Sequence, residues 1–127
     1  MSAYLSQWTF DVRDVEVMAR FWSEALGYSI DRGDDGNAKL RPPAGSPPSV
    51  PTIWLQATAG PKTTKNRCHP DLSVPGSTAE ADARAEVDRL LALGATHADV
   101  GQTGDEGFVV LADPEGNEFC VLLRGAS

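Results

Sequence analysis

The segment DVEVMARFWSEALG, residues 14–27, decides how the chain is expected to fold. Asp14 is a residue type that caps helix N-termini, and Gly27 is the type that most often ends a helix. Between them, apolar residues recur at spacings of three and four, as on one face of an amphipathic helix. The pattern predicts a helix over 14–26 that buries Val15, Met18, Ala19, Trp22, Ala25 and Leu26.

A second segment, STAEADARAEVDRLLALG at residues 77–94, follows the same plan. Ser77 and Glu80 have the spacing of a capping box, in which each side chain bonds the other residue's backbone N–H. Gly94 ends this segment as Gly27 ends the first one. We therefore predict a second helix over 77–93, with Ala83, Val87, Leu90 and Leu91 on its buried face.

One strand is expected before each helix and three after it, because apolar and polar residues alternate there. In the first strand the alternation assigns Trp8 to the apolar, core-facing side, and Trp22 is assigned to the core as well. Five prolines make 42–51 a loop, and Asp113 to Gly116 is expected to form a tight turn. The expected strands are 4–12, 28–31, 37–41, 52–58, 67–74, 96–100, 107–112 and 117–123.

The order strand, helix, three strands thus occurs twice, which predicts an α+β fold. We expect two tandem βαβββ modules whose curled, antiparallel or mixed sheets surround a shared cleft. The whole chain, 1–127, would be a single domain. Module one would cover about 1–60, a linker about 59–66, and module two about 67–125.

Composition limits the classes of partner. A formal charge of −7 and a pI near 4.6 argue against nucleic acids and anionic membranes. Acids on helix surfaces explain this charge through solubility more simply than a cationic ligand would. No apolar run approaches the about 20 residues of a membrane span, and the N-terminus lacks a signal-peptide pattern. We therefore expect a cytoplasmic protein whose two cysteines, Cys68 and Cys120, are reduced.

Four strands, two from each half, carry a polar or mixed face opposite the apolar one. An ordinary solvated sheet face would explain them, but such faces are rich in Lys, Glu and Thr. Trp, His, Cys and Gln suit a concave ligand site better, so composition slightly favours a binding cleft. The residues on these faces are Gln7, Thr9, Asp11, Trp54, Gln56, His69, Asp71, Ser73, Glu118 and Cys120.

Several motifs, taken together, resemble the vicinal-oxygen-chelate superfamily of glyoxalases, bleomycin-resistance proteins and dioxygenases, and more narrowly its glyoxalase-like branch. They cover nearly the whole chain in the order expected for that superfamily. The resemblance implies paired βαβββ modules around a cleft, a small-molecule ligand and a homodimer. The motifs are Asp14 with FWSEALGY (21–28), KNRCHPDLSV (65–74), LLALGAT (90–96) and DPEGNEFCVL (113–122).

Metal-dependent members of this superfamily place four ligands in the cleft, two from each module. The resemblance puts Gln7 at the first position, Gln56 or Trp54 at the second, His69 at the third and Cys120 at the fourth. Glu118 lies two residues before Cys120, on the same face. Only His69 keeps the usual ligand type, which argues against glyoxalase I chemistry and extradiol ring cleavage. We expect no metal or other cofactor, with a divalent metal as the alternative.

Two hypotheses of function follow. The first is a metal-independent protein that binds a small organic molecule through Gln7, Thr9, Asp11, Trp54, Gln56, His69, Asp71, Glu118 and Cys120. The second is an enzyme of the lyase or isomerase type acting on a small carbonyl or hydroxy compound. His69 with Glu118 or Asp71 would then supply acid–base catalysis or bind a metal. A non-catalytic structural or regulatory domain is a third possibility.

Overall fold

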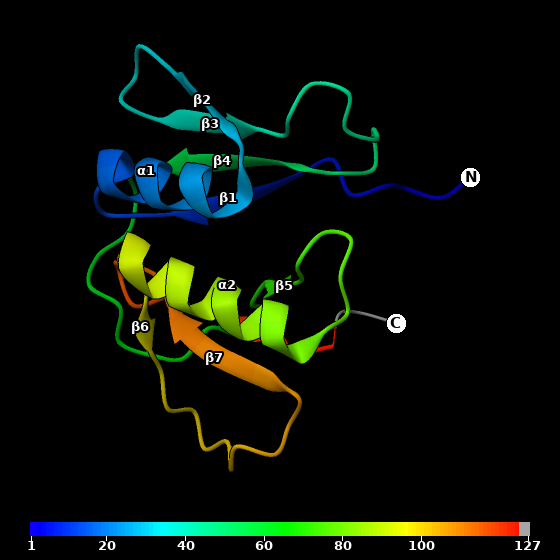
Figure 1. Cartoon of the computed structure of the whole chain (residues 1–127). Helices are drawn as coiled ribbons and strands as arrows, with labels where there is room; N and C mark the ends of the chain where they lie inside the picture. Colours follow the sequence, from blue (N-terminus) through cyan, green and yellow to red (C-terminus); the bar gives the residue numbers. More distant parts are fainter. Residues whose placement is uncertain (125–127) are drawn as a thin grey trace. The chain divides into compact units, whose positions relative to one another are not determined.

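A computed structural model describes residues 1–124 and divides the chain into two compact units. The first unit is Met1–Pro61, and the second begins at Lys62. Each unit contains one helix and one four-stranded sheet (Figure 1). None of the helices in the described part of the chain is both long enough and apolar enough to span a membrane.

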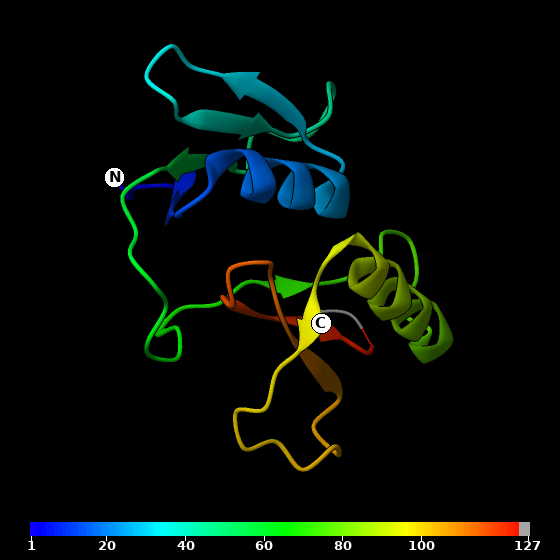
Figure 2. The ribbon, with the colours of Figure 1, turned by 90° about the vertical axis from the view of Figure 1, so that its left-hand side faces the viewer.

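The first unit contains β1 (Gln7–Asp11), α1 (Val15–Leu26), β2 (Ser29–Arg32), β3 (Ala38–Arg41) and β4 (Thr52–Gln56). The strands lie in the order β1-β4-β3-β2. β1 is parallel to β4, whereas β2, β3 and β4 pair antiparallel. Figure 2 shows the β2–β3 hairpin beside the helix of this unit.

The second unit contains β5 (Asp71–Leu72), α2 (Glu80–Leu93), β6 (Thr96–His97), β7 (Phe108–Ala112) and β8 (Glu118–Leu122). Its order, β5-β8-β7-β6, repeats that of the first unit strand for strand. The first and last strands are again parallel and the other pairs antiparallel. This repeat confirms the predicted α+β fold with tandem βαβββ modules.

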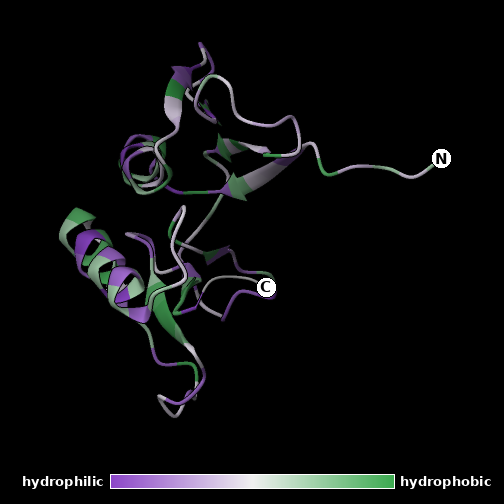
Figure 3. Ribbon diagram, turned by 45° about the vertical axis from the view of Figure 1, so that its right-hand side comes forward, coloured by the Kyte–Doolittle hydropathy of each residue, from purple (hydrophilic) through white to green (hydrophobic). Residues whose placement is uncertain are grey.

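The core of the first unit lies between α1 and one face of its sheet. Met18, Ala19 and Trp22 of the predicted apolar stripe are fully or almost fully buried, and so are Leu40 and Leu55 on the sheet. The Trp22 ring packs edge-on against two phenylalanine rings, those of Phe10 and Phe21, at centroid distances of 5.8 and 5.1 Å. Figure 3 shows how hydrophobic and hydrophilic residues alternate around each helix.

The core of the second unit centres on β8. Phe119, Cys120 and Val121 are all buried, although successive side chains of a strand point to opposite faces. Both faces of β8 are therefore covered. Ala83, Val87 and Leu90 of α2 are buried as predicted.

Both helices end where the sequence predicts, but only α1 begins as predicted. The Val17 N–H donates to Asp14 Oδ1 at 3.1 Å, and Gly27 takes the left-handed conformation with φ +71°. α2 begins at Glu80, after an N-cap residue, Ala79, that supplies no side-chain bond. The predicted capping box is wrong, because the Ser77 hydroxyl bonds Asp82 Oδ2 and the Ala79 N–H instead.

Several assignments based on strand alternation are also wrong. β1 starts at Gln7 rather than at residue 4, and Trp8 is 44% exposed instead of lying in the core. β1 is an edge strand, and α1 packs mainly over β2, β3 and β4, so Trp8 is left uncovered. The strands expected over 67–74 and 96–100 are shortened to the two-residue strands β5 and β6, and Cys68, outside β5, is exposed. Both cysteines are free.

Candidate functional site

The five candidate residues of the first unit lie on adjacent strands. Gln7, Thr9 and Asp11 are exposed on β1, and Trp54 and Gln56 are partly exposed on β4. In the parallel register Thr9 is opposite Trp54 and Asp11 is opposite Gln56. Side chains two residues apart on a strand share a face, so all five lie on the face opposite buried Ile53 and Leu55. We call this the polar face of the first sheet.

Several side chains on the polar face bond one another. The Thr52 hydroxyl lies 3.3 Å from Gln7 Oε1, and the Thr58 hydroxyl donates to Asp11 Oδ1 at 2.7 Å. Lys39 comes from β3, where it is opposite Trp54 in the register. Its ammonium lies 5.9 Å from the centroid of the Trp54 ring, within the range of a cation–π contact.

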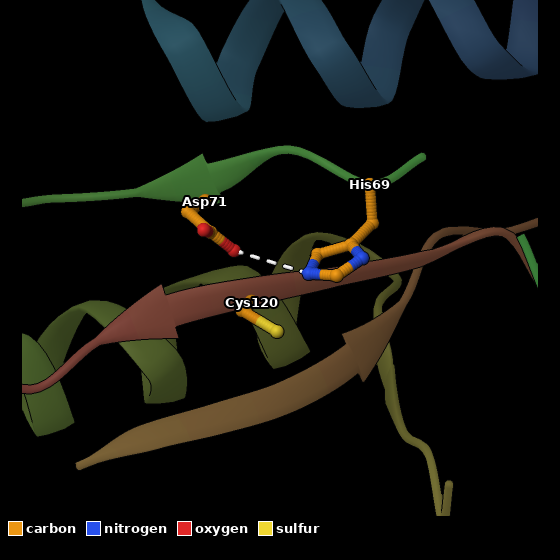
Figure 4. Close-up of side chains that lie close together, drawn as sticks. All are labelled: His69, Asp71 and Cys120. Atoms are coloured by element: carbon orange, nitrogen blue, oxygen red, sulfur yellow. Dashed lines mark ion pairs between the residues drawn. The ribbon is translucent and has the colours of Figure 1, made fainter. Parts of the chain in front are cut away.

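In the second unit His69, Asp71 and Cys120 form a cluster, shown in Figure 4. One ligand atom from each residue lies within 4.8 Å of the others. Asp71 is opposite Cys120 in the parallel β5–β8 pair, and His69 Nε2 lies 3.4 Å from Asp71 Oδ1. His69 and Asp71 are partly open to solvent, whereas Cys120 is buried.

The position of His69 differs from the prediction, which put it in the same strand as Asp71. In a regular strand the Cα atoms of residues i and i+2 are almost 7 Å apart, and their side chains run side by side. His69 is not in the strand, because Pro70 follows it and proline has no N–H to donate to a sheet. The Pro70 carbonyl accepts from the Cys120 N–H at 3.0 Å, so pairing with β8 begins only after His69.

Cys120 is held as a neutral thiol. Burial raises its pKa, the nearby Asp71 carboxylate raises it further, and Lys65 opposes the shift only partly. The resulting pKa is about 11. Since the thiolate is the nucleophilic form, Cys120 is unreactive at neutral pH as it stands.

Glu118 shares a face of β8 with Cys120, but its carboxylate already has partners. It forms an ion pair with Lys62 at 2.7 Å and accepts the Asn66 N–H at 2.9 Å. The Asn66 side-chain amide donates to the Glu118 carbonyl, and Lys62 also bonds the Thr64 carbonyl. The Glu118 side chain is only 11% exposed. It therefore fastens residues 62–66 to β8, a role that the sequence did not predict.

The pKa of Glu118 reflects these contacts. Burial alone would raise it, but the Lys62 ammonium and the Asn66 N–H together outweigh burial. The pKa consequently lies below its ordinary value of 4.5, and the group is ionised at neutral pH. An ionised, bonded carboxylate is a poor general acid.

The donor atoms of the cluster fit one class of metal better than another. Imidazole nitrogen, carboxylate oxygen and thiol sulfur are all common zinc ligands, whereas Mn²⁺ prefers oxygen and nitrogen. Three ligands of these types leave one position of a tetrahedral zinc ion open for a water or substrate. The cluster His69, Asp71 and Cys120 thus fits zinc, after small side-chain movements that bring the three ligand atoms closer.

Comparison with known proteins places the chain among related folds. The family model of the glyoxalase-like domain matches residues 7–122. No match was found among curated proteins.

Three solved structures illustrate the likeness of fold. A glyoxalase/bleomycin resistance protein/dioxygenase family enzyme from Burkholderia phytofirmans is 21% identical, with a TM-score of 0.65 over 94% of this chain and 97% of that one. The fosfomycin resistance protein FosX from Mesorhizobium loti is 17% identical, with a TM-score of 0.69 over 99% and 95%. A variant of FosX from Listeria monocytogenes, complexed with Mn(II) and 1S,2S-dihydroxypropylphosphonic acid, is 13% identical, with a TM-score of 0.70 over 98% and 93%.

Proposed function

The chain belongs to the glyoxalase-like domain family, and we propose that it binds a small organic molecule without requiring a metal for binding. The observation that carries this proposal is the polar face of the first sheet. There a large aromatic side chain, Trp54, stays partly exposed among short polar groups instead of joining the core.

The chemistry of the polar face supports ligand binding. An indole ring gives a planar ligand a wide apolar contact at little cost in conformational entropy. Gln7, Thr9 and Gln56 supply neutral donors and acceptors beside it, and Asp11 supplies a carboxylate. A few polar groups around an apolar surface are typical of small-molecule sites.

In the second unit we propose that His69, Asp71 and Cys120 contact the ligand. Glu118 has a different part in this proposal, because its bonds to Lys62 and Asn66 occupy its carboxylate. It would position residues 62–66 near the cluster. The cleft shared by the two modules remains a prediction.

A second candidate is a lyase or isomerase, and the His69–Asp71 contact favours it. If His69 donates its Nε2 proton to Asp71, its Nδ1 atom keeps a free lone pair that can accept a proton from a substrate. Where a zinc ion is bound, His69, Asp71 and Cys120 would hold it, and the ion would supply Lewis-acid polarisation of a substrate oxygen.

A thermal-stability screen tests the first candidate against the second. We expect organic compounds to stabilise the protein in the presence of a chelator, by about 2.7 kcal/mol at one hundred times Kd. Trp54→Ala should weaken binding of such a compound by about 1–3 kcal/mol. Trp8→Ala is the matched control, because Trp8 belongs to the other face of the same sheet.

A response to zinc instead of to organic compounds would favour the second candidate, a lyase or isomerase. Stabilisation by zinc alone, lost in His69→Ala, together with no response to any compound in the presence of chelator, would overturn metal-independent binding. Elemental analysis of the purified protein gives a direct check, since we expect no stoichiometric divalent metal.

A further inference from the structure

Lys39 is an unusual residue on the polar face because no carboxylate neutralises it. β3 alternates between buried Ala38 and Leu40 and outward-facing Lys39 and Arg41. Within residues 1–124 the Lys39 ammonium forms no ion pair. It lies over the neutral ring of Trp54 instead. In a chain with a formal charge of −7, an unpaired cation at a partly buried position calls for an explanation.

The carboxylate that could pair with Lys39, that of Asp31, is bonded to another residue. In the antiparallel β2–β3 register, Asp31 is opposite Lys39. Opposite charges at such positions ordinarily attract each other. The Asp31 carboxylate instead bonds Arg41, whose Nε and Nη2 atoms lie 3.2 and 3.0 Å from Asp31 Oδ2. Lys39 is thus left with its charge available.

The remaining neighbour of Lys39 is an aromatic surface. Trp54 and Lys39 are opposite each other in the register of β4 and β3. These two strands are neighbours in the first sheet (Figure 1). A distance of 5.9 Å between the ammonium and the ring centroid is short enough for a one-ring molecule to contact both. Lys39 and Trp54 together therefore offer a flat apolar ring face and one positive charge.

We infer that Lys39 and Trp54 form a subsite for a planar organic acid, with the ring of the acid on Trp54 and its carboxylate on Lys39. This inference rests on the proposed function and adds to it the charge class of the ligand. The overall negative charge of the protein would otherwise repel an anion, so selectivity for acids depends on this single cation.

Three probes of similar shape and different charge test the subsite: benzoate, neutral benzamide and cationic benzamidine. Binding is followed at low ionic strength by NMR, through the indole N–H signal of Trp54, which Trp54→Phe identifies. We expect benzoate to bind about tenfold more tightly than benzamide, as a charge-assisted contact requires. Benzamidine should bind most weakly.

Three variants separate the local effect of Lys39 from net charge. Lys39→Gln should abolish the preference for benzoate over benzamide, whereas Lys39→Arg should keep it. Arg20→Gln makes the same change in net charge on the exposed side of α1 and should also keep the preference. An unchanged NMR spectrum elsewhere shows that each variant is folded.

The outcomes distinguish this inference from ligand binding in general. A preference for benzoate that survives in Lys39→Gln overturns the subsite, as do equal affinities of the three probes for the natural protein. Failure of all three probes to move the Trp54 signal at millimolar concentration also overturns it. None of these results decides the proposed function, which the stability screen tests with its own compounds.

Discussion

At the scale of single residues, Glu118 and Cys120 share a face of β8 but have different surroundings. The sequence predicts both as site residues, because alternation places them on the same side of the strand. It does not reveal that Lys62 and Asn66 reach the Glu118 carboxylate across more than fifty residues of chain. Contacts between distant segments leave no trace in a local pattern.

Glu118→Gln is expected to lower stability at pH 7 by about 1–3 kcal/mol, because Lys62 loses its charged partner at a largely buried position. Since folding lowers the pKa of Glu118, its contribution is present above the unfolded value of 4.5 and is lost as pH falls through the lower, folded pKa. The difference between natural protein and variant should therefore shrink in acid. Urea denaturation at several pH values measures it.

The control for this experiment is Glu80→Gln, which removes a carboxylate that is 47% exposed and pairs with Arg84 on the same helix. Exposed pairs of this kind contribute little to stability. Equal costs for the two variants at pH 7 would contradict the assigned role of Glu118.

The polar face of the first sheet was predicted more fully than the cluster of the second unit. On β1 and β4 the alternation of side chains between the two faces predicts correctly that Thr9 and Trp54 share a face, because both strands are regular. The alternation also assigns His69 to a strand, although Pro70 follows it and indicates that the strand starts later. The exposure of Trp8 depends on β1 being an edge strand, which a local pattern does not show.

At the scale of elements, the two helices have equivalent ends and different beginnings. Gly27 and Gly94 both have positive φ, +71° and +123°, so the chain leaves each helix through a conformation that favours glycine. Helix ends were predictable from one residue type. The start of α1 is predictable from its cap, Asp14, but the start of α2 is not, since the Ser77 side chain has several possible partners near it.

Asp14→Ala should lower the free energy of unfolding by about 0.5–2 kcal/mol, because it removes the side-chain acceptor of the Val17 N–H. Ser77→Ala should cost less, since its hydroxyl lies before the N-cap of α2 and bonds Asp82 and the Ala79 N–H. Urea midpoints of the two variants provide the comparison. A larger loss for Ser77→Ala would show that Ser77 stabilises the start of α2 after all.

At the scale of the whole molecule, the repeated topology was predictable because each half carries its own helix signals and alternating strands. The parallel pairing of first and last strand in each unit was not visible in the pattern. The prediction of antiparallel or mixed sheets leaves this pairing open, since it joins segments that are distant in the sequence.

We predict a homodimer, on the basis of family membership and of exposed apolar side chains. Tyr4, Leu5, Trp8 and Val17 of the first unit are between 44% and 84% exposed in the single chain. Exposed apolar side chains of this size would gain by being buried in an interface. Light scattering at micromolar concentration should give about twice the chain mass of 13.5 kDa. A species of 13.5 kDa would contradict the prediction.

The parallel pairing of β1 with β4 has a consequence for synthesis on the ribosome. The strand that completes the first sheet, β4, ends at Gln56, so every strand of that sheet has been made before the second unit begins at Lys62. The nascent chain can therefore assemble its N-terminal sheet while the C-terminal half is still being translated. Its β1–β4 ladder joins residues 45 positions apart, as Gln7 and Thr52 are, and contacts of such long sequence separation in general slow folding.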